Sequence, residues 1–223
     1  MTPDEHWLAT LWPLVRAHLP APPARVVDIG CGPHGGFVPF LHSNGYDAAG
    51  VDPKAPDIAD YHRIEFEHLE LPERVDALIA STSLHHVTDP AEVIDRLTTT
   101  LRSDGTLVVF EWAWEKFDEA TAHWCFQRLG PNDEENWLHR RRDEWTTSGQ
   151  EWGTYLEDWA RRERLHRGEA LLRLLDERFE RRLLTFGPYF FPDLADTTDA
   201  DEQAAIAAGL IRATRIDWVG GRR

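Results

Sequence analysis

The stretch VVDIGCGPHGG, residues 26–36, decides the fold of this chain. Its first four residues form a short β-branched run typical of a buried strand, interrupted only by Asp28. The glycines that follow, Gly30, Gly32 and Gly35, let the backbone turn sharply and let a ligand approach the main chain closely. A short helix is expected after them. A strand, a glycine-rich turn and a helix in this order predict a ligand-binding loop at the end of a strand.

Strands and helices alternate on both sides of this turn. The pattern predicts further strands at 47–51, 61–67, 75–80, 106–110, 183–186 and 210–219, and helices at 3–19, 89–101, 169–180 and 199–208. Such alternation is typical of proteins in which helices cover both faces of a parallel sheet. We therefore expect an α/β fold with a Rossmann-like, doubly wound, mostly parallel seven-stranded sheet, an antiparallel edge strand and a helical insertion.

Tryptophan gathers after the fifth expected strand. Seven of the ten tryptophans lie within residues 112–167, namely Trp112, Trp114, Trp124, Trp137, Trp145, Trp152 and Trp159. Ser148 and Glu151 form a capping-box pattern before one amphipathic helix, whose aromatic face is expected to form the core of the insertion or a dimer seam. We expect one domain over residues 1–223, divided into a ligand-binding part at 1–111, a tryptophan-rich helical cap at 112–180 and closing strands at 181–223.

Two carboxylates separate the possible ligands of the glycine-rich turn. Asp28 stands two residues before Gly30, where it would lie close to a dinucleotide pyrophosphate and repel it, whereas a ligand with an ammonium and a sulfonium is compatible. Asp52 ends the next strand, where a carboxylate can accept both ribose hydroxyl protons. Asp52 therefore fits nicotinamide dinucleotides and S-adenosylmethionine (SAM) equally, and Asp28 favours SAM.

At these residues the chain resembles the class I SAM-dependent methyltransferases, in particular the small-molecule branch with the ubiquinone and menaquinone methyltransferases. The matching segments are 26–32 with Gly35, 51–52, 67–68, 71–72, 75–81, 84–87 and 101–107. The likeness covers residues 1–111 well and 181–221 moderately, while 112–180 match no function. The resemblance implies an enzyme that transfers a methyl group from SAM to an oxygen, nitrogen or carbon atom of a small molecule and releases S-adenosylhomocysteine (SAH).

The resemblance also implies which residues hold SAM. They are Asp28, Gly30, Gly32, Asp52, Glu67, His68 and Ser81. The two glycines would present backbone groups to the amino-acid end of SAM, Asp28 would orient their loop, and Asp52 would hold the ribose. Glu67 stands where the family usually has an acidic residue near the adenine, although aspartate is commoner there, and Ser81 would line the methionine end.

Catalytic and substrate residues are expected beyond the fourth strand. Methyl transfer from a sulfonium needs mainly a positioned nucleophile in a dry pocket, and an oxygen or nitrogen nucleophile can also need a base. His86 and His85 are the candidates, although one of them is expected to pack or cap the next helix instead. Glu111, His123 and His139 are alternative bases. Trp112 and Trp114 are the tentative substrate residues, and a flat aromatic substrate would suit such indoles.

Composition limits the partners. The net charge of −15 disfavours nucleic acid, and no apolar run approaches the roughly 18–20 residues of a membrane span. Only Cys31 and Cys125 are present, and the acidic start does not read as a secretory signal, so we expect a cytoplasmic protein. Two adjacent histidines among scattered acids do not make a zinc site, so no metal is expected. Either a monomer or a homodimer is compatible with the sequence.

Two other functions are compatible with some of these residues. An NAD(P)-dependent oxidoreductase would share the glycine-rich turn and Asp52, but the chain has no evident Tyr-x-x-x-Lys constellation and only two lysines, Lys54 and Lys116. A non-catalytic SAM-binding subunit that supports a partner enzyme would share the whole cofactor site.

Overall fold

A computed structural model describes residues 2–131 and 136–223. The strands are β1 (Arg25–Ile29), β2 (Asp47–Val51), β3 (Tyr61–His62), β4 (Val75–Ser81), β5 (Leu101–Trp112), β6 (Phe179–Gly187) and β7 (Arg215–Arg222). The α-helices are α1 (Pro3–His18), α2 (Val38–Ser43), α3 (Pro90–Thr100), α4 (Glu119–Phe126), α5 (Trp137–Ser148), α6 (Trp152–Glu163), α7 (Gly168–Arg178) and α8 (Asp199–Ala207). Within the described ranges, no helix has the length and apolar character needed to cross a membrane.

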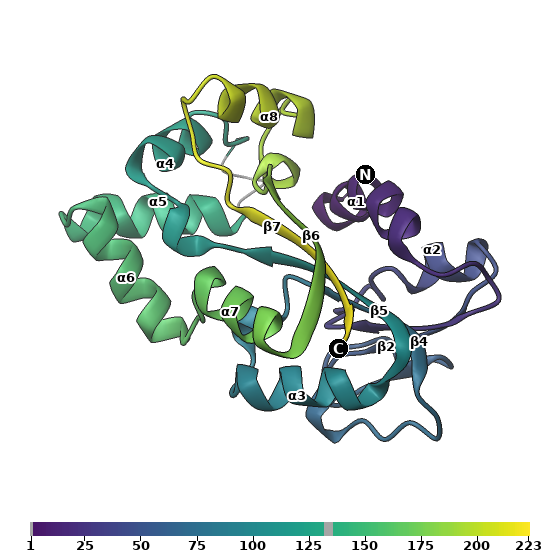
Figure 1. Cartoon of the computed structure of the whole chain (residues 1–223). Helices are drawn as coiled ribbons and strands as arrows, with labels where there is room; N and C mark the ends of the chain where they lie inside the picture. The colour runs from purple at the N-terminus through teal and green to yellow at the C-terminus, as the bar shows by residue number, and fades with distance from the viewer. Residues whose placement is uncertain (1, 132–135) are drawn as a thin grey trace.

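The seven strands form one sheet in the order β3-β2-β1-β4-β5-β7-β6. β1 pairs in parallel with β2 and β4, and β4 pairs in parallel with β5, whereas β7 is antiparallel to both of its neighbours (Figure 1). The predicted mostly parallel, doubly wound seven-stranded fold is confirmed. The antiparallel strand lies one position inside the edge, because β6 pairs with its outer side, and it begins at Arg215 rather than at Leu210.

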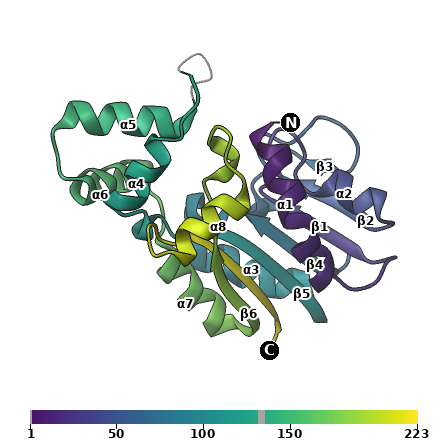
Figure 2. The ribbon, with the colours of Figure 1, turned by 90° about the horizontal axis from the view of Figure 1, so that it is seen from above.

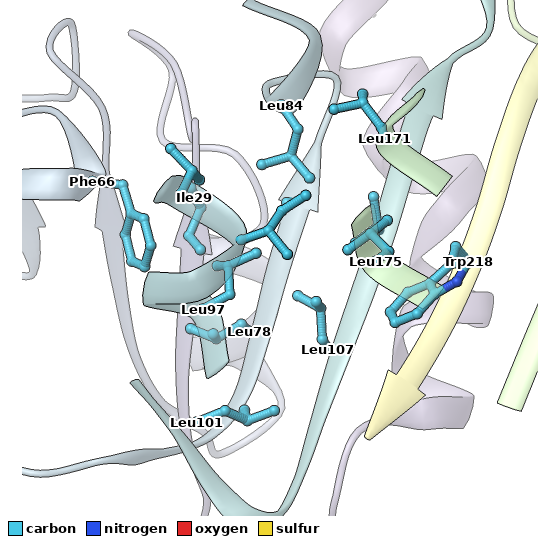
Figure 3. Packing of buried hydrophobic residues seen from close by; sticks show 14 of the residues in the cluster. Ile29, Phe66, Leu78, Leu84, Leu97, Leu101, Leu107, Leu171, Leu175 and Trp218 are labelled. Carbon is cyan, nitrogen blue, oxygen red and sulfur yellow. The ribbon is translucent and has the colours of Figure 1, made fainter. Parts of the chain in front are cut away.

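Alternating side chains of the central strands build a core on each face of the sheet. Val27 and Leu78 face α3 and α7 in a cluster that ends at Trp218, as Figure 3 shows for part of it. Val26 and Ile79, one residue along each strand, face α1 and α2 instead. Each fully buried aliphatic side chain contributes about 1.5–3 kcal/mol of burial free energy. Two apolar faces per strand explain why these strands read as continuous apolar runs.

A third apolar cluster joins α4, α5 and α6 into a separate layer, which we call the cap (Figure 2). Its core includes Phe117, Trp152 and Tyr155, all almost fully buried. α7 does not belong to it, because α7 packs on α3 against the sheet. The expected capping box at Ser148 is wrong: α6 begins after Glu151, whose side chain makes no capping bond, and Ser148 accepts a hydrogen bond from the Gln150 N–H instead.

Candidate active site

The buried side chain of Asp28 holds the glycine-rich turn in place. This buried carboxylate accepts a hydrogen bond from the Phe37 N–H (2.7 Å), so it ties the end of β1 to the start of α2. Gly36 has a φ of +54°, and a Cβ there would stand 2.1 Å from Asp28 Oδ2. Only glycine therefore fits at this position. Burial raises the pKa of Asp28 to about 7, the Phe37 N–H opposes that shift, and nearby Asp52 adds to it.

Asp52 and Glu67 share one cavity of about 460 Å³ at the carboxyl ends of β1, β2 and β4. We call it the Asp52 cavity. The Asp52 carboxylate accepts a hydrogen bond from the Lys54 N–H through Oδ1 (2.6 Å), which fixes its orientation. Phe66 supplies an apolar wall beside Glu67. His68 is exposed and does not line this cavity, because it lies at the end of a short 3-10 helix (Phe66–His68) whose other two residues do.

A second cavity, of about 180 Å³, lies over the glycine-rich turn. We call it the Gly32 cavity, and Asp28, Gly30 and Ser81 also line it. Gly32 has a φ of +65° and open space where a Cβ would point, so its backbone is accessible to a ligand. Trp7 of α1 closes one side, and its indole N–H donates to Ser81 Oγ (3.0 Å).

A third cavity, of about 230 Å³, lies between α1, the start of α5 and the loop after β6. We call it the Tyr189 cavity. Its lining residues are Pro3, Asp4, Trp7, Thr82, Trp137, Tyr189, Pro192 and Asp193. Asp4, Trp7 and Thr82 line the Gly32 cavity as well, so the two spaces adjoin.

Thr82 lines all three cavities. Its φ is +51°, a conformation that is an outlier for a β-branched residue and costs on the order of 1–3 kcal/mol. Two hydrogen bonds stabilise this backbone conformation. The Thr82 N–H donates to the Phe110 carbonyl (2.7 Å), and the Thr82 hydroxyl donates to the Ser81 carbonyl (2.8 Å). Such strain typically marks a functional position, and here it marks the junction of the cavities.

The tandem histidines have different surroundings. His85 is buried, and its Nδ1 lies 2.6 Å from Glu111 Oε2, while Glu111 Oε1 accepts a hydrogen bond from the Leu84 N–H (2.6 Å). Glu111 therefore ties the loop after β4 to the end of β5. His86 lies at the exposed rim of the Asp52 cavity, 4.1 Å from the His85 ring between centroids. Partial burial, and then His85, lower the pKa of His86, so its imidazole is neutral near pH 7.

His86 lines the same cavity as Asp52, and it lines neither the cavity of Ser81 nor that of Tyr189. This position favours contact with the cofactor, and a catalytic role for either histidine stays a prediction. The alternative bases are dispersed: Glu111 is engaged by His85, and His139 is buried with Nε2 3.0 Å from the Gly130 carbonyl.

Trp112 and Trp114 are both almost fully buried in the cluster that forms the cap core. The Trp114 indole N–H donates to the His166 carbonyl (3.0 Å), so Trp114 anchors the cap to the start of α7. Trp112 stacks on Tyr189, with ring centroids 5.3 Å apart and planes within 8°. Its substrate role stays a prediction, and in this position it supports a wall of the Tyr189 cavity from behind.

A buried carboxylate on α8 fixes the loop that carries Tyr189. Glu202 accepts hydrogen bonds from three consecutive N–H groups, those of Tyr189 (2.7 Å), Phe190 (2.9 Å) and Phe191 (2.7 Å). Burial raises the pKa of Glu202, and the three N–H donors oppose that shift. α8 thus shapes the Tyr189 cavity although Glu202 does not line it.

Sequence reasoning missed most of the Tyr189 cavity. Trp7 belongs to the apolar face of the expected first helix, and Asp193 and Tyr189 follow a strand that had no motif. Thr82 lies between the two matched segments 75–81 and 84–87, and only its backbone geometry shows its strain. Trp137 was one of seven tryptophans, with nothing local to separate it from the others.

The Asp52 and Gly32 cavities together fit SAM. They share Gly30 and Thr82, and they place the Asp52 carboxylate at one end and an exposed glycine backbone with a buried carboxylate at the other. A ligand with a sulfonium and an ammonium complements Asp28, whereas a pyrophosphate would not. This arrangement at the carboxyl edge of a doubly wound sheet defines a class I methyltransferase.

Comparison with known proteins agrees with this class. The profile of the family described as "Methyltransferase domain" matches residues 5–178, and the chain therefore belongs to that family, with SAM as its cofactor. A ubiquinone biosynthesis O-methyltransferase from a Bradyrhizobium strain is 30% identical over 137 residues, which cover 55% of this chain and 51% of that protein. The chain thus spans about half the length of the curated relatives that it matches.

Solved structures share the fold. A SAM-dependent methyltransferase from Mesorhizobium loti has a TM-score of 0.57 at 22% identity, covering 95% of this chain and 97% of that one. The N-methyltransferase NodS from Bradyrhizobium japonicum, solved with SAH, has a TM-score of 0.54 at 13% identity, covering 99% and 88%. Family membership also decides against the oxidoreductase alternative.

Proposed function

We propose that this protein transfers the methyl group of SAM to a nucleophilic atom of a small molecule in the cytoplasm. The observation that carries the proposal is the pair of adjoining cavities that meet at Gly30 and Thr82, beside a third cavity fit for an acceptor. When bound, SAM supplies an electrophilic methyl carbon. The two cysteines are free and buried, which suits a reducing compartment.

Each part of the chain then has a task. Asp52 holds the ribose hydroxyls, Glu67 and Phe66 contact the adenine, and Gly32 presents its backbone to the methionine end. Asp28 keeps the turn in place and offers negative charge to a cationic ligand. Trp7 closes the methionine end against water, which favours a displacement between two oriented reactants.

Calorimetry with SAH, SAM and NADH tests the cofactor assignment. We expect SAH and SAM to bind with micromolar or lower dissociation constants and NADH to bind far more weakly, because Asp28 repels a pyrophosphate. Turnover is tested with methyl-labelled SAM, a metabolite extract and mass spectrometry of the labelled product. Tight NADH binding without SAH binding would refute the methyltransferase function. SAH binding without any labelled product would favour the non-catalytic SAM-binding subunit.

A further inference from the structure

The Tyr189 cavity combines aromatic rings with two carboxylates. Trp7, Trp137 and Tyr189 contribute the rings, and Asp4 and Asp193 contribute the carboxylates. The rings of Trp7 and Tyr189 meet edge to face, with centroids 5.3 Å apart and planes at 74°, so they form two differently oriented walls. Faces of tryptophan and tyrosine attract organic cations, and more strongly where water is excluded. Rings and carboxylates together are a recognition site for a cationic group.

Asp193 is held in place within this cavity. Its Oδ2 accepts a hydrogen bond from the Trp137 indole N–H (2.8 Å), and its backbone carbonyl accepts one from Asn136 Nδ2 (2.6 Å). Burial raises the pKa of Asp193, the Trp137 N–H opposes this, and Asp4 adds to it. Burial thus makes the Asp193 carboxylate a better proton acceptor than an exposed aspartate.

The charges around the cavity select against anions. Its described lining residues include no lysine or arginine. Arg215 is the cation packed behind it, 5.8 Å from the Trp7 ring centroid, and Arg215 is already paired with Asp217 (2.6 Å). A phenolate or carboxylate acceptor would therefore meet Asp4 and Asp193 without a compensating charge.

We propose that the Tyr189 cavity receives the methyl acceptor and selects a primary or secondary amine, protonated in solution and carried on a compact apolar body, with Asp193 as its proton acceptor. The inference rests on the proposed methyltransferase function. The cavity adjoins the Gly32 cavity at Asp4, Trp7 and Thr82, so an amine held there faces the methionine end of the cofactor site.

The reaction balances with the groups present. The ammonium gives one proton to the Asp193 carboxylate, and the freed nitrogen lone pair forms the N–C bond to the methyl carbon. The S–C bond breaks, and its electron pair stays on sulfur as the thioether of SAH. The methylated product is again an ammonium, and Asp193 returns its proton to water. This assigns to Asp193 the base function that His86 carried in the sequence-based expectation.

The first test uses a cation that cannot be methylated. Benzyltrimethylammonium is titrated into SAH-saturated protein in a calorimeter, and 2-phenylethanol serves as a neutral ligand. We expect the cation to bind at least about tenfold more weakly to Asp193→Asn and to Asp4→Asn than to the parent, as for loss of a charged partner. Asparagine keeps an oxygen for the Trp137 N–H, so the cavity wall stays intact. Asp104→Asn, an exposed change on the opposite end of β5, is the matched control and should bind as the parent does.

The second test measures acceptor choice with methyl-labelled SAM. The expected result is transfer to 2-phenylethylamine in preference to catechol and 2-phenylethanol, with turnover lost in Asp193→Asn while its SAH affinity is unchanged. Preference for catechol would overturn the amine assignment, as would equal binding of benzyltrimethylammonium to the parent and to Asp193→Asn. Full turnover in Asp193→Asn combined with loss in His86→Ala would overturn the role of Asp193. Absence of SAH binding would instead refute the methyltransferase function itself, so the two failures are distinguishable.

Discussion

The cofactor cavities and the cap differ in what positions their side chains. Around Gly32 and Asp52 the main chain does most of the positioning, through positive φ angles, strand ends and carboxylates at fixed distances along the sequence. In the cap, indole rings pack on one another, and only Trp137 of that layer reaches a described cavity of the site. In the first region, local sequence decides which groups line a cavity, whereas in the second this depends on which ring the packing leaves uncovered.

The largest effect that separates the two regions is expected at Trp152. This indole is fully buried and donates to the Phe117 carbonyl (2.5 Å), so Trp152→Ala should lower the free energy of unfolding by about 3–5 kcal/mol. SAH affinity of the folded protein should change little, because distant sites act independently. Chemical denaturation and calorimetry measure the two quantities. Trp124→Ala, which removes a half-buried ring, is the control and should cost less. Loss of SAH affinity in Trp152→Ala would show that cap and cofactor site are coupled.

The reverse pattern is expected at Asp52. Removing this carboxylate in Asp52→Ala should weaken SAH binding by roughly 1–3 kcal/mol, because the ribose hydroxyls lose a charged acceptor. The melting temperature should stay close to that of the parent, since Asp52 is only partly buried. Calorimetry and thermal unfolding test both statements. Asp57→Ala, an exposed change in the same loop, is the matched control. Parent-like SAH binding in Asp52→Ala would refute the ribose assignment.

A pH-dependent effect on stability is expected at Asp28. Its pKa is about 7 in the folded chain and 3.8 ordinarily, so Asp28 makes folding less favourable as pH rises from about 4 to 7. Asp28→Asn should therefore melt at a higher temperature than the parent at pH 8, and the difference should shrink toward pH 4. The asparagine oxygen can still accept the Phe37 N–H.

The same carboxylate should make SAM binding pH-dependent. Because the cationic ligand favours ionised Asp28, SAM affinity of the parent should rise from pH 6 to pH 8 by up to about tenfold, or roughly 1.4 kcal/mol. SAH lacks the sulfonium and should show a smaller rise, and Asp28→Asn should show almost none. Calorimetry at both pH values measures this. An equal rise for SAM and SAH in Asp28→Asn would assign the dependence to another group.

The sequence predicted the parts of the molecule whose positions follow from local spacing. The glycine-rich turn, Asp28 and Asp52 lie at the expected edge because strand ends in a parallel sheet converge there, and their contacts with a ligand stay a prediction. His68 was expected at the cofactor site but does not line the cavity. A single 3-10 turn decides that Glu67, and not the adjacent His68, faces it. That choice depends on tertiary packing rather than on residue type.

The Tyr189 cavity could not be predicted, because its walls come from four separate segments. Asp4 and Trp7 come from α1, Thr82 follows β4, Trp137 begins α5, and Asp193 follows β6. No spacing in the sequence relates them. Their position at the end of the fifth strand suggested Trp112 and Trp114 as site residues, but that position could not show that both rings are covered.

The carboxylate of Glu202 restrains the local motion of the loop that carries Tyr189. Three successive amide protons, those of Tyr189, Phe190 and Phe191, are bonded to one side chain. Their exchange with solvent deuterium therefore requires one shared opening event, in which the loop leaves α8, and the three amides should exchange as a single cooperative unit. α8 thus governs the opening of a loop that lines the Tyr189 cavity, although no α8 residue is among the described lining residues.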